Sequence, residues 1–222
     1  MTQETPLGML VGRLAEADPH RPAITCGEKS VSRAELDART NRLARAYRDR
    51  GVTRDSFVTI GLPNGIEFFE AMVAAWKLGA IPQPISSRLP AAERRAIIDL
   101  ARPALVVGVD PAESPGASAV PAGFEADSSL SAEPLPPEVA ASFKAPTSGG
   151  STGRPKLIVA TQPSTWEPIA GFAALLQIPT DGVHLVTGPL YHNGPFTTAL
   201  FALLSGNHLV SCRASSRSRR SP

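Results

Sequence analysis

The sequence has little cysteine and no long apolar run, and each absence excludes a class of protein. Cys26 and Cys212 are the only two cysteines in 222 residues, so neither a metal-ligating cluster nor a disulfide framework can be built from them. No apolar run is long enough to cross a bilayer. The N-terminus lacks the basic segment and apolar run of a secretory signal. We therefore expect a cytoplasmic protein with free thiols and no integral association with a membrane.

A large excess of charge of one sign is also lacking. The chain has 22 lysines and arginines against 20 acidic residues, a net charge of +2. No global field therefore directs it towards nucleic acid, and we expect no nucleic-acid partner. The hydrophobic content of 42% is ordinary for a globular protein, and 22 prolines with 18 glycines imply many turns.

Strand-like and helix-like segments alternate along the chain, which favours an α/β fold with a mainly parallel sheet. Ser32 and Glu35 form the pattern of a capping box at the start of one helix. The segment 80–85, AIPQPI, predicts an irregular or edge strand, because its prolines cannot donate to a ladder. The other expected strands are 57–62, 104–109, 157–160 and 183–188, and the expected helices are 66–79, 90–100, 166–176 and 196–204.

Two segments depart from this alternation. Residues 111–137 are rich in Pro, Ala, Ser and acidic residues, which indicates a surface excursion or a flexible connection. Residues 211–222 hold four arginines and five serines. This segment predicts a solvated tail rather than a phosphate-binding arm, because no aromatic or helical pattern accompanies the arginines.

The stretch TSGGSTGRPK, residues 147–156, has the composition of a phosphate-binding loop. Small residues let backbone N–H groups approach an anion closely, and hydroxyl groups add donors. Lys156 supplies a mobile positive charge for phosphate oxygens. The stretch is not a Walker loop, because Pro155 precedes the lysine and Leu157 follows it. A plain Gly/Ser connection between two strands is the alternative. The residues expected to bind phosphate are Ser148, Gly149, Gly150, Ser151, Thr152, Gly153 and Lys156.

This stretch resembles the signature loop of the adenylate-forming (AMP-binding) superfamily, which includes acyl-CoA synthetases, luciferases and the adenylation domains of peptide synthetases. The family's loop is usually Tyr-Thr-Ser-Gly-Thr-Thr-Gly-x-Pro-Lys. Thr147 and Gly149 depart from its tyrosine and its serine. Two more segments, WKLGAIPQPIS at 76–86 and GPLYHNGPF at 188–196, resemble further segments of the family. The loop positions that match are Gly150, Thr152, Gly153, Pro155 and Lys156.

The resemblance implies that residues 1–210 are part of the N-terminal domain of an acyl-CoA synthetase. In that family a carboxylate attacks the α-phosphate of ATP, giving an acyl-adenylate and pyrophosphate, and coenzyme A then takes the acyl group as a thioester. Loop amides, Lys156 and Mg²⁺ would offset the charge of the outer phosphates. The expected ligands are ATP, Mg²⁺, coenzyme A and a small carboxylic acid whose identity the sequence does not specify.

Tyr191 and His192 are the candidate substrate-binding residues. The Pro-Leu-Tyr-His segment resembles the part of the family that lies beside the carboxylate pocket, which places His192 near the reacting carboxylate. Within a loop, the alternative for His192 is a structural role, and for Tyr191 it is a place in the core. Phe68, Phe69 and Trp76 are expected in the core.

Family members are much longer than this chain. Their ribose-binding acidic residue, Thr-Glu motif and C-terminal domain are not found after Val210, so we expect no useful thioester formation by the chain alone. The alternative to a ligase is a non-catalytic remnant that binds nucleotide or a partner chain. The incomplete sheet is also expected to leave an exposed edge prone to association or oligomer formation.

Overall fold

The computed structural model describes residues 4–114, 116–148 and 155–211, which form two four-stranded sheets and one short hairpin. The first sheet has the order β4-β3-β5-β6 and is parallel throughout. The second has the order β2-β1-β10-β9, in which only the β1–β2 pair is antiparallel. This architecture confirms the predicted α/β class. The strands of the first sheet are β3 (Phe57–Ile60), β4 (Ile81–Pro84), β5 (Leu105–Val107) and β6 (Ala119–Val120), and those of the second are β1 (Pro22–Cys26), β2 (Lys29–Ser32), β9 (Val183–Val186) and β10 (His208–Ser211).

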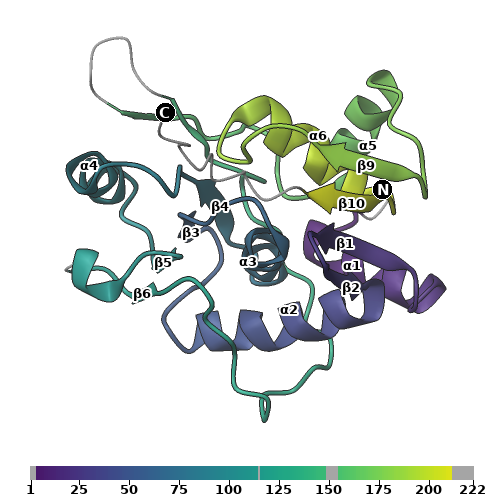
Figure 1. Ribbon diagram of the computed structural model, residues 1–222, viewed down its shortest axis with the longest axis horizontal. Coiled ribbons are helices and arrows are strands. Elements are labelled where there is room, and N and C mark those ends of the chain that lie inside the picture. The colour runs from purple at the N-terminus through teal and green to yellow at the C-terminus, as the bar shows by residue number, and fades with distance from the viewer. Residues whose placement is uncertain (1–3, 115, 149–154, 212–222) are drawn as a thin grey trace, which may run out of the picture.

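One helix is the centre of the core. Figure 1 shows α3 (Ile66–Lys77) between the two sheets, with α2 (Arg33–Arg48) running beneath it. Phe68, Phe69 and Trp76 are fully buried, as the sequence predicted. The remaining helices are α1 (Leu7–Ala17), α4 (Ala91–Ala101), α5 (Trp166–Leu175) and α6 (Asn193–Leu204), with a 3-10 turn at Pro111–Glu113. No helix in the described residues has the length and apolar character needed to cross a bilayer.

Local sequence signals predicted the start of α2 and the edge position of β4. The Ser32 hydroxyl accepts from the Glu35 amide at 3.2 Å, and the Glu35 carboxylate accepts from the Ser32 amide at 2.7 Å, which confirms the capping box of α2. Strand β4 is at the edge of its sheet, as its prolines Pro82 and Pro84 required.

The strand predicted at 157–160 is shorter than expected. Only Lys156 and Leu157 form β8, paired antiparallel with β7 (Thr147–Ser148). Beyond it, the amides of Ile158 and Ala160 still donate to carbonyls of the opposing segment. Ile158 is 54% exposed, because no layer of the described chain covers it. The apolar run there reflects an irregular surface hairpin and not a buried strand.

Segment 111–137 contributes to the fold. Ala119 and Val120 form β6 beside β5, and Val120 is buried. Farther along, the side chains of Asn41, Arg42 and Arg45 in α2 donate to the carbonyls of residues 132, 130 and 133. These bonds satisfy backbone groups that a segment without regular pairing leaves open. Ser211, expected to begin the tail, is the last residue of β10, and residues 212–222 lie outside the described part of the chain.

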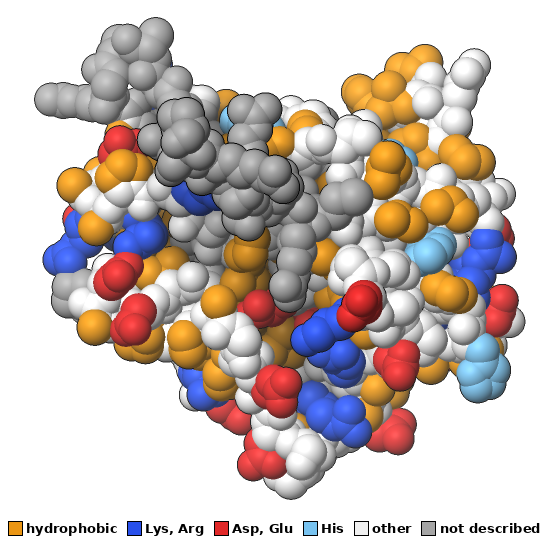
Figure 2. Space-filling model, viewed as in Figure 1, with side chains coloured by type: hydrophobic (Ala, Val, Ile, Leu, Met, Phe, Trp, Pro, Cys, Tyr) orange, Lys and Arg blue, Asp and Glu red, His pale blue; other side chains and the backbone are white. Residues whose placement is uncertain are grey.

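An apolar surface lies over the last strand of the second sheet and the helix beside it. Strand β9 has a neighbour on one side only in the described residues, and its Val183 and Leu185 are 69% and 54% exposed. Phe172 and Leu175 of α5 are exposed as well. Figure 2 shows hydrophobic side chains gathered in this region. The predicted association through an unpaired edge therefore has a specific candidate surface.

Two helical glycines are expected to respond oppositely to alanine. A Cβ on Gly8 of α1 would lie 2.7 Å from Lys77 Cα and Trp76 O, whereas a Cβ on Gly171 of α5 would meet nothing within 4 Å. Gly8→Ala should force α1 away from α3 and lower the free energy of unfolding by about 1–3 kcal/mol. Gly171→Ala should raise it by about 0.5–1 kcal/mol through helix propensity. Thermal unfolding followed by circular dichroism measures both, and changes of the same sign would contradict the close α1–α3 approach.

Candidate functional site

The β7–β8 hairpin flanks the predicted phosphate loop. Its register pairs Thr147 with Leu157 and Ser148 with Lys156, so the residues that enter and leave the loop are held side by side. Ser148 is half-buried and Lys156 is exposed. The other predicted phosphate-binding residues, Gly149, Gly150, Ser151, Thr152 and Gly153, lie outside the described residues.

Buried polar side chains connect the hairpin to the first sheet. The Gln83 amide donates to the Thr147 hydroxyl at 2.7 Å, and its carbonyl accepts from the Thr59 hydroxyl. Gln83 and Thr59 are fully buried in the adjacent strands β4 and β3. The sheet therefore fixes the start of the loop through a side-chain relay. In the sequence, Gln83 is the only polar residue of the segment 80–85 and lies between its two prolines. This signal was available, and sequence analysis missed it.

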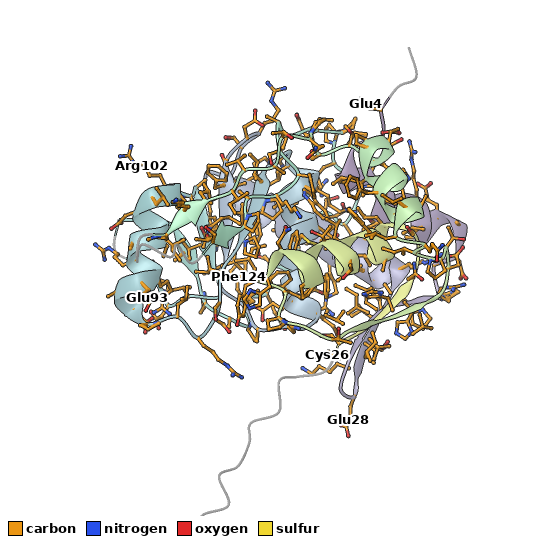
Figure 3. All side chains as sticks on the ribbon, turned by 90° about the horizontal axis from the view of Figure 1, so that it is seen from above. Glu4, Cys26, Glu28, Glu93, Arg102 and Phe124 are labelled. Carbon is orange, nitrogen blue, oxygen red and sulfur yellow. The ribbon has the colours of Figure 1, made fainter. Side chains whose placement is uncertain are left out.

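Tyr191 and His192 face the same cleft as the hairpin. This cleft has a volume of about 640 Å³ and is lined by the end of β4, by α4, by Thr147 and Ser148 of the hairpin, and by Tyr191 and His192. Glu93 of α4, marked in Figure 3, also lines it. The structure thus brings the predicted substrate residues to the described part of the predicted phosphate site. Lys156 is not among the described residues that line this cleft.

The turn that carries His192 is held by a residue that sequence analysis did not single out. Asn64, in the connection from β3 to α3, donates to the Gly188 carbonyl and accepts from the Leu190 amide, both at 2.9 Å. His192 then precedes the first residue of α6 and is exposed, with its ring centroid 4.4 Å from that of half-buried Tyr191. In the sequence, Asn64 and Gly65 follow a buried strand and form a turn signal. The bonds of Asn64 to Gly188 and Leu190 were not predictable from sequence.

A second lysine, Lys144, contacts the start of α6, directly after this turn. Sequence analysis did not single it out. Its Nζ donates to Asn193 Oδ1 at 2.6 Å and to the Thr197 hydroxyl, both on α6. The rings of Phe143 and Phe196 lie 5.0 and 5.8 Å from the Nζ. Burial lowers the pKa of Lys144 to about 8.

A metal centre made by protein side chains alone is not apparent in the described ranges. No three His, Cys, Asp or Glu side chains there lie close enough together to hold an ion.

Comparison with known proteins identifies the family. The family described as "AMP-binding enzyme" matches residues 12–222, and the chain belongs to it. The 2,3-dihydroxybenzoate-AMP ligase of Bacillus subtilis (strain 168) is 30% identical over 214 residues, covering 86% of this chain and 40% of that protein. Feruloyl-CoA synthase of Amycolatopsis sp is 31% identical over 217 residues, covering 92% and 43%. The chain thus spans less than half of these relatives.

Solved structures agree on the fold. The N-terminal domain of FACL13 from Mycobacterium tuberculosis superposes with a TM-score of 0.76 at 22% identity, covering 94% of this chain and 57% of that one. The o-succinylbenzoate CoA synthetase MenE from Bacillus subtilis gives a TM-score of 0.78 at 19% identity, with coverage of 95% and 56%. The chain therefore has the architecture of the N-terminal part of adenylate-forming enzymes.

Proposed function

We propose that this chain provides the phosphate-binding part of an enzyme that activates a carboxylic acid with ATP. A carboxylate oxygen forms a bond to the α-phosphorus, the bond from that phosphorus to the bridging oxygen breaks, and pyrophosphate leaves. A thiol sulfur, which we propose to be that of coenzyme A, then forms a bond to the carbonyl carbon of the acyl-adenylate, the bond from that carbon to the phosphate oxygen breaks, and AMP and the thiol proton are released. Mg²⁺ would offset the phosphate charge during the first step.

One observation carries this proposal. The hairpin that flanks the loop TSGGSTGRPK lies at the same cleft as Tyr191 and His192, although more than thirty residues separate them in the sequence. A site that joins a nucleotide to a carboxylate must hold two anions together, because positioning both reactants is worth roughly 7–11 kcal/mol of the barrier. We assign the loop residues and Lys156 to the phosphates, and His192 with Tyr191 to the acid.

Coenzyme A as the acceptor is supported only by similarity. Feruloyl-CoA synthase and a long-chain-fatty-acid–CoA ligase, FadD13 of Mycobacterium tuberculosis, are among the relatives, but so is a dimodular nonribosomal peptide synthase of Bacillus subtilis. The first step, adenylation, is common to both alternatives in our proposal. A bile acid, a fatty acid and an aryl acid are each candidates for the substrate.

A second candidate function is nucleotide binding without turnover. It requires only the phosphate loop, whose flanking hairpin is fixed to the first sheet by the hydrogen bond from Gln83 to Thr147. In that case the chain would bind ATP through the loop but would not release pyrophosphate. Incubation with ATP, Mg²⁺, coenzyme A and mixed carboxylic acids distinguishes the two, because a thioester detected by mass spectrometry requires the complete reaction.

Lys156→Ala tests the phosphate assignment. Loss of one charge-assisted hydrogen bond should cost about 1.5–3 kcal/mol of ATP binding, roughly a 10- to 150-fold weaker Kd. Binding of AMP should change much less, because the lysine is assigned to the outer phosphates. Ligand-observed NMR titration of the 222-residue chain suits the weak binding that we expect from it.

The control for this experiment is Lys29→Ala. Lys29 is an exposed lysine at the start of β2 in the other four-stranded sheet, so its removal changes the net charge equally but should leave both nucleotides unaffected. Equal losses for ATP and AMP in Lys156→Ala, or the same losses in Lys29→Ala, would argue against the phosphate loop.

A further inference from the structure

Two lysines are buried in this structure, and they differ in how their charge is balanced. Lys77 Nζ lies 2.6 Å from Asp37 Oδ1 and 2.6 Å from Asn41 Oδ1, so a carboxylate neutralises it. Lys144, 8% exposed, has only neutral partners, Asn193 and Thr197. Within the described ranges no carboxylate lies within 4.0 Å of its Nζ. Lys144 is therefore a buried cation without a counter-ion in that part of the chain.

The surroundings make this charge costly. Asn193 is the first residue of α6 and Thr197 follows one turn later, so the ammonium group lies at the end of the helix where the partial charge is also positive. Burial, which lowers the pKa of Lys144 to about 8, disfavours the charged form as well. A bound anion would relieve both effects, because an opposite charge favours the protonated amine.

The position of Lys144 connects it with the cleft. Lys144 precedes Thr147 by three residues, and its partner Asn193 directly follows His192. Thr147 and His192 both line the 640 Å³ cleft, whereas Lys144, Asn193 and Thr197 are not among its lining residues. A carboxylate bound at Asn193 and Lys144 would thus be held one residue along the chain from His192, which we assign to the acid.

We propose that Lys144 Nζ, together with the Asn193 and Thr197 side chains, forms an anion site that binds a carboxylate of the acid substrate. The proposal rests on the proposed function for the identity of the ligand. The carboxylate is either the one that is activated or a second one on the same acid, and the chemistry of recognition is the same for both. A charge-assisted hydrogen bond in a place of low dielectric constant would supply the affinity.

The test combines carboxylate binding with thermal stability in the 222-residue chain. The probes are benzoate and phthalate, with benzamide as an uncharged control, and the variants are Lys144→Met, Lys144→Arg and the exposed control Lys29→Met. We expect the wild-type chain and Lys29→Met to bind at least one of the two carboxylates, and Lys144→Met to bind it about tenfold more weakly or worse. Lys144→Arg should retain part of the affinity because it retains the charge. Benzamide binding should not depend on residue 144.

Stability provides a readout that a purely structural lysine would not give. Without a probe, Lys144→Met should unfold at the same temperature as the wild-type chain or higher, because it removes an uncompensated buried charge. Lys77→Met, which leaves Asp37 without its partner, should unfold at a lower temperature. Failure of Lys144→Met to fold, or a fall in its unfolding temperature with unchanged carboxylate binding, would overturn the proposal.

The two probes identify which carboxylate is bound. Equal loss of benzoate and phthalate in Lys144→Met indicates the carboxylate that reacts, and loss of phthalate alone indicates a second carboxylate. Unchanged binding of both, or no carboxylate binding by the wild-type chain, overturns the anion site. The Lys156→Ala nucleotide titration is independent of these results, so a failure of the phosphate assignment is distinguishable from a failure of the anion site.

Discussion

Replacement of Trp76 by alanine should lower the free energy of unfolding by about 3–5 kcal/mol. The indole is fully buried on α3, and its N–H donates to the Phe143 carbonyl at 2.9 Å. The substitution therefore creates a large cavity between the two sheets and also leaves a buried carbonyl without its donor. Because the stability of a domain is usually about 5–15 kcal/mol, this loss should be a large fraction of the total.

The effect of Trp76→Ala should extend to the functional site. Phe143 immediately precedes Lys144, and β7 begins three residues after Lys144, so the indole N–H holds the irregular segment that leads to β7 and the phosphate loop. Urea unfolding followed by far-UV circular dichroism measures the change without depending on tryptophan fluorescence. Trp76→Phe, which fills most of the volume but lacks the donor, should cost less, about 1–2 kcal/mol.

The other tryptophan provides the control. Trp166, at the start of α5, is only partly buried, so Trp166→Ala should cost clearly less than Trp76→Ala. Similar losses for the two alanine variants would mean that α3 is not the centre of the core.

Asp37→Ala should be nearly as damaging, at about 3–5 kcal/mol, although it removes a carboxylate that is only partly buried on α2. The reason is Lys77, whose side chain is only 4% exposed and whose Nζ lies 2.6 Å from Asp37 Oδ1. Burial lowers the pKa of Lys77, and the Asp37 carboxylate counteracts that effect. Asp37 also accepts from the Asn41 side chain at 3.0 Å. Its removal leaves a buried ammonium group with a single neutral partner among these three residues.

A double-mutant cycle separates the stability lost with the ion pair from the cost of leaving the Lys77 charge buried without its partner. Asp37→Ala combined with Lys77→Met should recover part of the stability lost in Asp37→Ala alone, because the buried cation is then absent as well. Urea unfolding of the single and double variants gives the coupling energy. The matched control is Asp99→Ala in the exposed Arg95–Asp99 pair of α4, whose side chains are 46% and 67% exposed and for which we expect less than about 0.5 kcal/mol. A loss in Asp37→Ala no larger than in Asp99→Ala would contradict the structural role of the pair.

The sequence by itself determined the features that depend on neighbouring residues. The capping box of α2, the burial of α3, the edge position of the proline-containing β4 and the α/β class follow from local chemistry and periodicity, and the structure confirms each of them. The loop motif also determined the family. Each of these signals lies within a short window of the chain, where spacing and side-chain type are sufficient.

Only the tertiary structure decided which polar residues belong to the site and which strands join. Strand β10 pairs with β1, nearly the whole length of the chain away, and the two residues of β6 complete a sheet within a segment whose composition predicted a surface excursion. Gln83, Asn64 and Lys144 acquired their roles from partners that are distant in the sequence. The physical reason is that the cost of a buried polar group, and the partner that offsets it, depend on the three-dimensional surroundings and not on the identity of the residue.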